Sequence, residues 1–217
     1  MKALIHFVVP VVMLISGVAF GESANKVRTG WDFAGLPLIN FTSDRGMGYG
    51  AYVASYYHGP SGAGENPYRA SIAGQFYQTT GGYAFHKFLV DFPNLLDSGL
   101  RLELLMGYEA WDSAWYFGRG DSTPRLLPEE TPENFYEYDI KSFWVVPALR
   151  VPLSNSWSLF MGGAFRLVAS EVYDQSRLEQ DAPRGVEGGS LSQLSFGVLY
   201  DSRDTEPTPL SGIFSEV

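Results

Sequence analysis

Few residues in this chain have the types and the spacing that catalysis requires. The sequence contains three histidines and no cysteine, which excludes disulfides, thiolate metal sites and a thiol nucleophile. A serine–histidine pair of the kind that an outer-membrane phospholipase uses could combine His86 with a serine such as Ser71 on a neighbouring predicted strand. No nucleophile motif surrounds either residue. We therefore predict that the protein is not an enzyme, and assign no catalytic, cofactor-binding or metal-binding residue.

Acidic and glycine-rich segments provide two weaker candidates for ligand sites. Glu129, Glu130 and Glu133 could offer carboxylates to calcium, but an acidic segment broken by prolines is far more often a solvated loop. Residues 61–64 and 185–189 are rich in glycine, yet neither segment opens a helical pattern. Because phosphate-cradling loops lead into a helix, we expect no phosphate site in either segment.

An aromatic cluster is a third candidate. Trp111, Trp115, Tyr116 and Phe117 follow one another closely, and rings of this kind stack on sugars. The same composition is typical of the aromatic belt that membrane proteins place at the lipid–water interface. We interpret the cluster as a belt.

The start of the chain has the pattern of an export signal. Residues 1–21 combine a positively charged beginning, an uncharged apolar stretch, and small residues at Ala19 and Gly21, where signal peptidase would cleave. We predict a signal peptide over 1–21, a short periplasmic segment over 22–34, and one domain over 35–217. No second apolar segment of about 20 residues follows, so we expect no membrane-spanning helix.

Composition narrows the class of protein further. The net charge of −9 argues against nucleic acid as a partner. Aromatic residues make up 15% of the chain, and there are 24 glycines. This combination fits closely packed strands and the aromatic girdles of outer-membrane barrels.

Strict alternation of apolar and polar residues carries the prediction of fold. In residues 100–110 the even positions are apolar, whereas Arg101, Glu103 and Glu109 occupy odd positions. Residues 157–167 and 194–203 alternate in the same way. A period of two places each set on one face of a sheet.

Residues 136–146 show the pattern as well. There we expect Trp144 and Val146 on the apolar face, and Asp139 and Lys141 on the polar face. A soluble sandwich also alternates, so the period does not choose between lipid and a protein core. The exported leader and the charge pairs on the polar face favour an antiparallel transmembrane β-barrel.

We predict eight strands and the start of a ninth near Gly212. Two long connections, 112–134 and 170–190, fall on the same side of the predicted sheet, where outer-membrane barrels keep their longer extracellular loops. The eight predicted strands cover residues 36–43, 47–57, 68–78, 83–92, 99–110, 135–151, 157–169 and 191–201.

A short motif lies at the end of the last long strand. Asp201, Arg203 and Asp204 form a D-x-R-D sequence that is followed by Pro209 and Gly212. The first aspartate and the arginine have the same parity, so we expect them to pair inside the barrel. The second aspartate, the proline and the glycine suit a tight turn.

A second motif, Phe117-Gly118-x-Gly120, follows a predicted strand. Together the two motifs resemble elements of the BamA/TamA outer-membrane assembly family, also called bacterial surface antigens. The resemblance spans about residues 35–217 and implies a sixteen-stranded closed barrel. By that comparison the chain contains about its N-terminal half, an incomplete barrel of eight or nine strands.

The chain also departs from that family. The segment 22–34 has no room for the periplasmic POTRA repeats, and the Arg-Gly-Phe/Tyr element of the family's inward-folded loop is missing. An isolated half-barrel would leave two unpaired edges, which lipid does not tolerate. We therefore expect a truncated chain, or several chains that close the sheet together.

The resemblance implies a role in protein or lipid insertion or translocation at a Gram-negative outer membrane. Its partners would be outer-membrane lipid, lipopolysaccharide and client outer-membrane proteins, without a cofactor. Two alternatives stay open: a passive pore, suggested by the charged inner face, and a small eight-stranded structural barrel.

Overall fold

The structure is a computed structural model that describes residues 27–63, 67–120, 123, 126, 131–206 and 209–217. The predicted signal peptide lies outside the described residues. So do Glu129 and Glu130 of the acidic segment.

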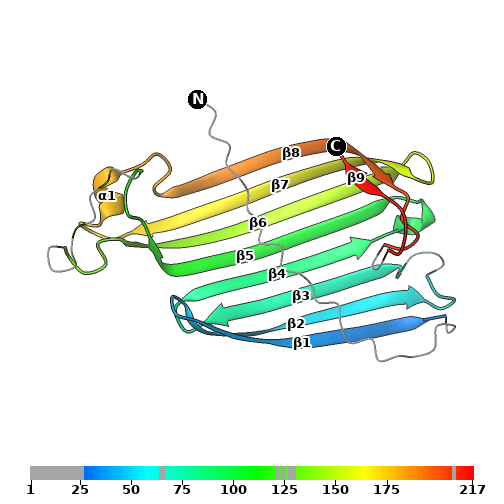
Figure 1. The fold of residues 1–217 in the computed structure, drawn as a ribbon, viewed down its shortest axis with the longest axis horizontal. Coiled ribbons are helices and arrows are strands. Elements are labelled where there is room, and N and C mark those ends of the chain that lie inside the picture. The colour runs from blue at the N-terminus through cyan, green and yellow to red at the C-terminus, as the bar shows by residue number, and fades with distance from the viewer. Residues whose placement is uncertain (1–26, 64–66, 121–122, 124–125, 127–130, 207–208) are drawn as a thin grey trace.

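The described chain folds into one antiparallel sheet in which each strand pairs with the next along the sequence (Figure 1). A 3₁₀ helix, η1 (Leu95–Asp97), and a short helix, α1 (Arg177–Asp181), lie in connections. No helix in the described part of the chain is long and apolar enough to cross a bilayer. The strands are β1 (Gly30–Thr42), β2 (Gly46–Gly59), β3 (Ala70–Thr79), β4 (Tyr83–Phe92), β5 (Arg101–Trp115), β6 (Glu137–Pro152), β7 (Trp157–Val172), β8 (Gly188–Asp201) and β9 (Phe214–Glu216).

The all-β antiparallel fold expected from the sequence is confirmed, with differences in detail. Strand β1 begins at Gly30, six residues before the predicted start. Strand β5 continues past residue 110 because its register with β6 shifts between Trp111 and Ala114, where Ser113 has a φ of +64°. Such a bulge lets a strand run on through an extra residue. Strands β1 and β9 are not paired with each other, so the sheet of described residues is open.

The connections fall into two groups at opposite ends of the sheet. The long connections, 116–136 and 173–187, lie at the same end, at the left of Figure 1, as predicted. The connections 60–69, 93–100, 153–156 and 202–213 lie at the other end.

One face of the sheet is apolar and exposed. Cross-strand partners project to the same face, and the register places a continuous set of large apolar side chains on one side. We call this the outer face and the opposite side the inner face. Exposed members of the outer set include Trp31, Phe33, Ile39, Val53, Phe76, Phe88, Tyr108, Phe143, Met161, Phe165, Leu194 and Phe196.

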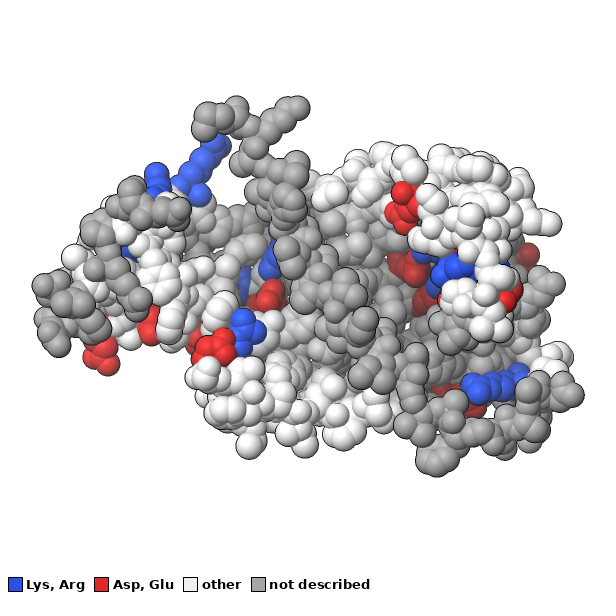
Figure 2. Space-filling view, viewed as in Figure 1, with Lys and Arg blue, Asp and Glu red and all other residues white. Residues whose placement is uncertain are grey.

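The inner face carries the ion pairs. Figure 2 shows acidic and basic side chains lying next to each other in small groups on the face turned to the viewer. In Figure 1, which has the same orientation, the β8–β9 connection (red) lies in front of the strand ends at the right.

The face assignment predicted for residues 136–146 is wrong. Phe143 lies opposite Tyr108 and Leu167 on the outer face, and Lys141 shares its parity. Trp144 therefore points to the inner face. Gly107 makes room for it there, since a Cβ atom on that glycine would lie 2.0 Å from Cζ2 of the indole. Because Gly107 has no side chain, it leaves the space in which the indole of Trp144 packs on the inner face.

Candidate functional site

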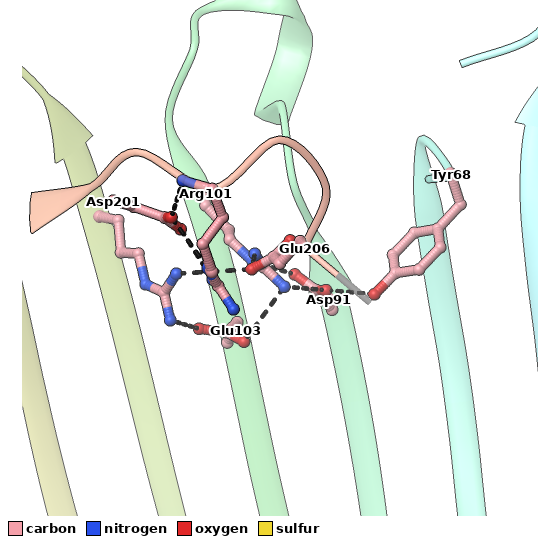
Figure 3. A network of polar contacts seen from close by, with 8 residues as sticks. Tyr68, Asp91, Arg101, Glu103, Asp201 and Glu206 are labelled. Atoms are coloured by element: carbon pink, nitrogen blue, oxygen red, sulfur yellow. Dashed lines mark hydrogen bonds and ion pairs between the residues drawn. The ribbon is translucent and has the colours of Figure 1, made fainter. Parts of the chain in front are cut away.

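A network of ion pairs occupies the inner face near the end that holds the β8–β9 connection (Figure 3). Its centre is Asp91, which lies near the end of β4 and is only 2% exposed. Arg101, the first residue of β5, donates two hydrogen bonds to it, from Nε to Oδ1 at 3.0 Å and from Nη2 to Oδ2 at 2.8 Å. A two-pronged contact of this kind is the strongest geometry for an arginine–carboxylate pair.

Tyr68 completes the environment of the buried carboxylate. It lies just before β3, and its hydroxyl donates a 2.6 Å hydrogen bond to Oδ2 of Asp91. Burial, followed by this hydrogen bond, raises the pKa of the Tyr68 phenol far above its usual value. The phenol therefore remains a proton donor at any physiological pH, and Asp91 keeps three hydrogen bonds in place of water.

Two arginines stand side by side at the edge of the network. Arg101 and Arg150 are direct partners in the β5–β6 register, an arrangement that needs negative charge to be stable. Glu103 lies 3.6 Å from each of them. Glu206, which comes from the β8–β9 connection, contacts Arg101 and lies 3.8 Å from Arg150. Two carboxylates thus bridge the two guanidinium groups.

The D-x-R-D motif builds the start of the β8–β9 connection. Arg203 donates to Asp201 from Nε at 2.9 Å and from Nη2 at 2.7 Å, so the predicted ion pair is present. The Arg203 guanidinium also lies 4.5 Å over the ring of Phe214 in β9. The hydrogen bonds to Asp201 raise the pKa of Arg203.

Asp204 holds the connection in its bend. Its Oδ1 accepts backbone N–H groups of Thr205, Leu210 and Ser211 at 2.9, 3.0 and 3.3 Å. These hydrogen bonds, that of Ser211 first, lower the pKa of the carboxyl group. The aspartate therefore ties residues six and seven positions ahead of it to its own position.

Gly212 and Pro209 are the remaining residues of this motif. Gly212 has a φ of +106°, and a Cβ atom there would lie 2.4 Å from the carbonyl oxygen of Ser202. Only glycine fits this close crossing of the chain. Pro209 is exposed in the same connection.

The second predicted motif lies at the other end of the sheet. Gly118 and Gly120 have φ values of +112° and +80°, and the Phe117 ring packs 5.2 Å from that of Tyr136. Arg119 between them donates to the carbonyl oxygen of Asp181 at 2.9 Å. The motif thus joins the two long connections to each other, and the structure does not bring it near the D-x-R-D motif.

The sequence did not predict helix α1, which lies in the second long connection. Ser176 caps it by accepting the N–H of Glu179 at 3.2 Å, and the Glu179 carboxylate accepts the N–H of Gln175 at 2.6 Å. Leu178 is buried. The signal for this helix is the spacing Ser-x-x-Glu before the helical turn, which is typical of a capping box.

The structure separates the serine and histidine of the phospholipase alternative. Ser71 lies opposite Asp91 on the inner face, whereas His86 lies opposite Tyr108 on the outer face. A dyad needs the two side chains within hydrogen-bonding distance. Opposite faces of one sheet do not allow it.

The predicted aromatic belt also divides. Trp111 lies on the inner face, where the Arg45 guanidinium sits 4.5 Å from its ring and 4.3 Å from the ring of Tyr83. Trp115 and Phe117 are 61% and 45% exposed. Including Trp111 in the belt was wrong, because the apolar parity of β5 runs through the even residues.

Most of the ion-pair network was not predicted from the sequence. Arg101 and Glu103 were recognised as polar-face partners, but Asp91, Arg150 and Glu206 were not. A charge at Asp91 inside the apolar run 88–92 was a usable signal. Nothing local marks Glu206, because its partner lies 105 positions away.

Among known proteins, the likenesses of this chain are to solved structures. No family model matches the chain, and no curated protein matches it. The fold is similar to the crystal structure of BamA from Haemophilus ducreyi lacking POTRA domains 1–3, with a TM-score of 0.44 and 15% sequence identity. The match covers 84% of this chain and 32% of that chain, so the present chain spans about a third of the length of the protein it resembles.

Proposed function

We propose that this protein is an integral outer-membrane protein whose sheet lies in the bilayer as part of a barrel wall. The observation that carries the proposal is the outer face, where large apolar side chains are exposed on eight consecutive strands. Soluble monomers rarely expose apolar patches of more than a few hundred Å². Acyl chains are the environment that suits this face, while the paired charges of the inner face suit an enclosed, hydrated space.

The finer role that we propose is assistance in inserting or translocating outer-membrane proteins or lipids. Its support is the sequence resemblance of the D-x-R-D and Phe-Gly-x-Gly motifs to the BamA/TamA family. Outer-membrane lipid, lipopolysaccharide and client outer-membrane proteins are the partners that this role requires. We propose no enzymatic step; the serine–histidine pair considered from the sequence, Ser71 and His86, lies on opposite faces of the sheet.

A passive pore is the second candidate, and the charged inner face favours it. The β8–β9 connection favours the assembly role instead, because Glu206 holds this connection across the inner face at one end of the sheet. In a closed barrel, a connection held across the inner face would narrow the channel.

Membrane integration is tested first. Envelopes from cells that express the full chain are washed with sodium carbonate, and the pellet is analysed on gels with and without heating. We expect the protein to stay in the pellet and to migrate differently after heating. Recovery in the aqueous fraction would overturn the proposal.

Two further measurements separate the candidate roles. Purified protein in liposomes should speed the folding of an added outer-membrane barrel above the rate in empty liposomes. In planar bilayers it should show brief, irregular currents. Steady conductance without any effect on folding would favour the pore.

A further inference from the structure

Lys87 is a half-buried cation on the inner face of β4 that contacts no carboxylate among the described residues. The other cations on inner-face positions of the strands are all paired. Arg101, Arg150 and Arg166 have a carboxylate oxygen within 2.8, 3.6 and 3.2 Å. The ammonium group is half-buried, so protein surface replaces part of its hydration, and no described carboxylate compensates for that loss.

The register places a second unsatisfied polar group beside it. Gln75 in β3 lies directly opposite Lys87, which sets their Cβ atoms about 5 Å apart. The side-chain amide of Gln75 makes no hydrogen bond within the described part of the chain. An ammonium group and an amide N–H group thus stand next to each other on one face, both free to donate.

The carboxylate diagonal to Lys87 on the neighbouring strand is already engaged. Glu109 in β5 is a diagonal neighbour of Lys87 in the register. Its Oε1 accepts the hydroxyl of Tyr83 at 3.0 Å and its Oε2 accepts Nη2 of Arg166 at 3.2 Å. Its charge is therefore already paired with Arg166, and Lys87 has no counter-ion among the residues that the structure describes.

The walls of the site are aromatic. The Phe85 ring lies 5.3 Å from Nζ of Lys87 and stabilises the charge without neutralising it. On the other side, Gly107 is the cross-strand partner, and the indole of Trp144 fills the space above this glycine. Lys87 therefore lies between two aromatic side chains, those of Phe85 on its own strand and Trp144 above the neighbouring glycine.

The site is separate from the ion-pair network. Lys87 and Asp91 lie four residues apart on β4, about 13 Å along a strand. Between them, Leu89 with its partners Ala73 and Leu105 forms an apolar row across the inner face. The carboxylates of the network therefore do not compensate Lys87.

We propose that Lys87 and Gln75 bind an oxyanion, a phosphate or carboxylate group of a molecule that occupies the space in front of the inner face. Both protein groups donate hydrogen bonds and one carries a positive charge, so an anion with acceptor oxygens is their chemical complement. The inference goes beyond the proposed function and uses it only in taking the inner face to be turned away from lipid.

Chemical footprinting tests the site on the full chain in detergent. A water-soluble acetylating reagent is applied with inorganic phosphate, with acetate, or with chloride at equal ionic strength, and modified lysines are quantified by mass spectrometry. Lys141, which lies on the opposite face of the sheet from Lys87, is the internal control, and its own acetylation rate is compared among the three anions. For a dissociation constant on the order of 1 mM, about 10 mM anion slows acetylation of Lys87 about tenfold and leaves Lys141 unchanged.

Variants make the result decisive. Gln75→Leu keeps the reporter lysine and should reduce the protection. Lys87→Gln should abolish the increase in thermal stability that the anion gives, whereas Lys141→Gln should retain it. Stronger protection by phosphate or by acetate identifies the preferred group and supports the site. Equal protection by chloride, or none, would overturn it, even for a protein that has proved to be membrane-integrated.

Discussion

The carboxylate of Glu206 accepts a hydrogen bond from the guanidinium group of Arg101, although the two residues are 105 positions apart. The contact joins the β8–β9 connection to the first residue of β5, so the connection crosses the inner face above β6 and β7 (Figure 3). Sequence-local hydrogen bonds of Asp201, Arg203 and Asp204 shape this connection, and the long-range ion pairs of Glu206 with Arg101 and Arg150 hold it over β5 and β6.

Removing that charge should release the connection without unfolding the sheet. Glu206→Gln is expected to weaken local stability by about 1 kcal/mol, because the carboxylate is partly exposed. A loss of about 1 kcal/mol raises the population of the released connection about fivefold, so trypsin cleavage after Arg203 should become about fivefold faster. The matched control is Glu187→Gln, at an exposed carboxylate in the β7–β8 connection. Equal cleavage rates in both variants would contradict the role of Glu206 as an anchor.

Asp91 should contribute more to stability than any exposed aspartate. Asp91→Ala leaves Arg101 and Tyr68 without their shared acceptor in a buried place, which costs about 3 kcal/mol. Asp97→Ala removes a side chain that is 73% exposed and 3.6 Å from Arg69, and should change the free energy of unfolding by less than about 0.5 kcal/mol. Urea unfolding in detergent, followed by tryptophan fluorescence, measures both. Similar costs would show that the network adds little.

Gly107→Ala should disturb the packing of Trp144. The new methyl group would overlap the indole, and over-packing of this kind costs about 1–3 kcal/mol. Gly163→Ala is the control, because its methyl group would meet its nearest neighbours at an ordinary 3.7 Å. Trp144→Leu combined with Gly107→Ala should restore stability. A Gly107→Ala variant with unchanged unfolding and emission spectrum would place the indole elsewhere.

A positive charge should be tolerated on one face of β8 and not on the other. Phe196 lies on the outer face at 71% exposure, and its neighbour Ser195 lies on the inner face. Phe196→Lys should cost about 2–4 kcal/mol in the bilayer, whereas Ser195→Lys should cost far less. Folding yield into liposomes compares the two variants. The reverse order would mean that the faces have been assigned the wrong way round.

The bend of the β8–β9 connection should depend on pH through Asp204. Its pKa is lower in the folded chain than in the unfolded chain, so its stabilising effect is complete above the unfolded value and is lost as pH falls through the folded value. Amide hydrogen exchange at Leu210 and Ser211 should therefore become less protected at pH 3 than at pH 6, after correction for intrinsic rates. Asp204→Asn, which keeps an acceptor oxygen but does not titrate, should remove this pH dependence. Protection that still changes with pH in the Asn variant would implicate another group.

The alternation of apolar and polar residues predicted the faces correctly in strands whose apolar residues occupy every second position. Residues 100–110, 157–167 and 194–203 lie on the faces that their alternation indicated. Residues 136–146 do not, because apolar residues occupy both parities there and the pattern alone has no preference. The space left by the missing side chain of Gly107, on the neighbouring strand, allows Trp144 and the residues two positions away from it to face inward. Helix α1 was missed although its capping box was readable.

The sequence by itself determined the all-β fold, the order of the strands, and the bend formed by Asp201, Arg203, Asp204 and Gly212. These features depend on side-chain parity and on hydrogen bonds between residues close in the chain. Only the tertiary structure decided which charges meet. Asp91 pairs with Tyr68, Arg101 pairs with Glu206, and Lys87 has no counter-ion in the described part of the chain. Partners across a sheet are set by strand register and by where a connection returns, and neither is encoded in the spacing of one segment.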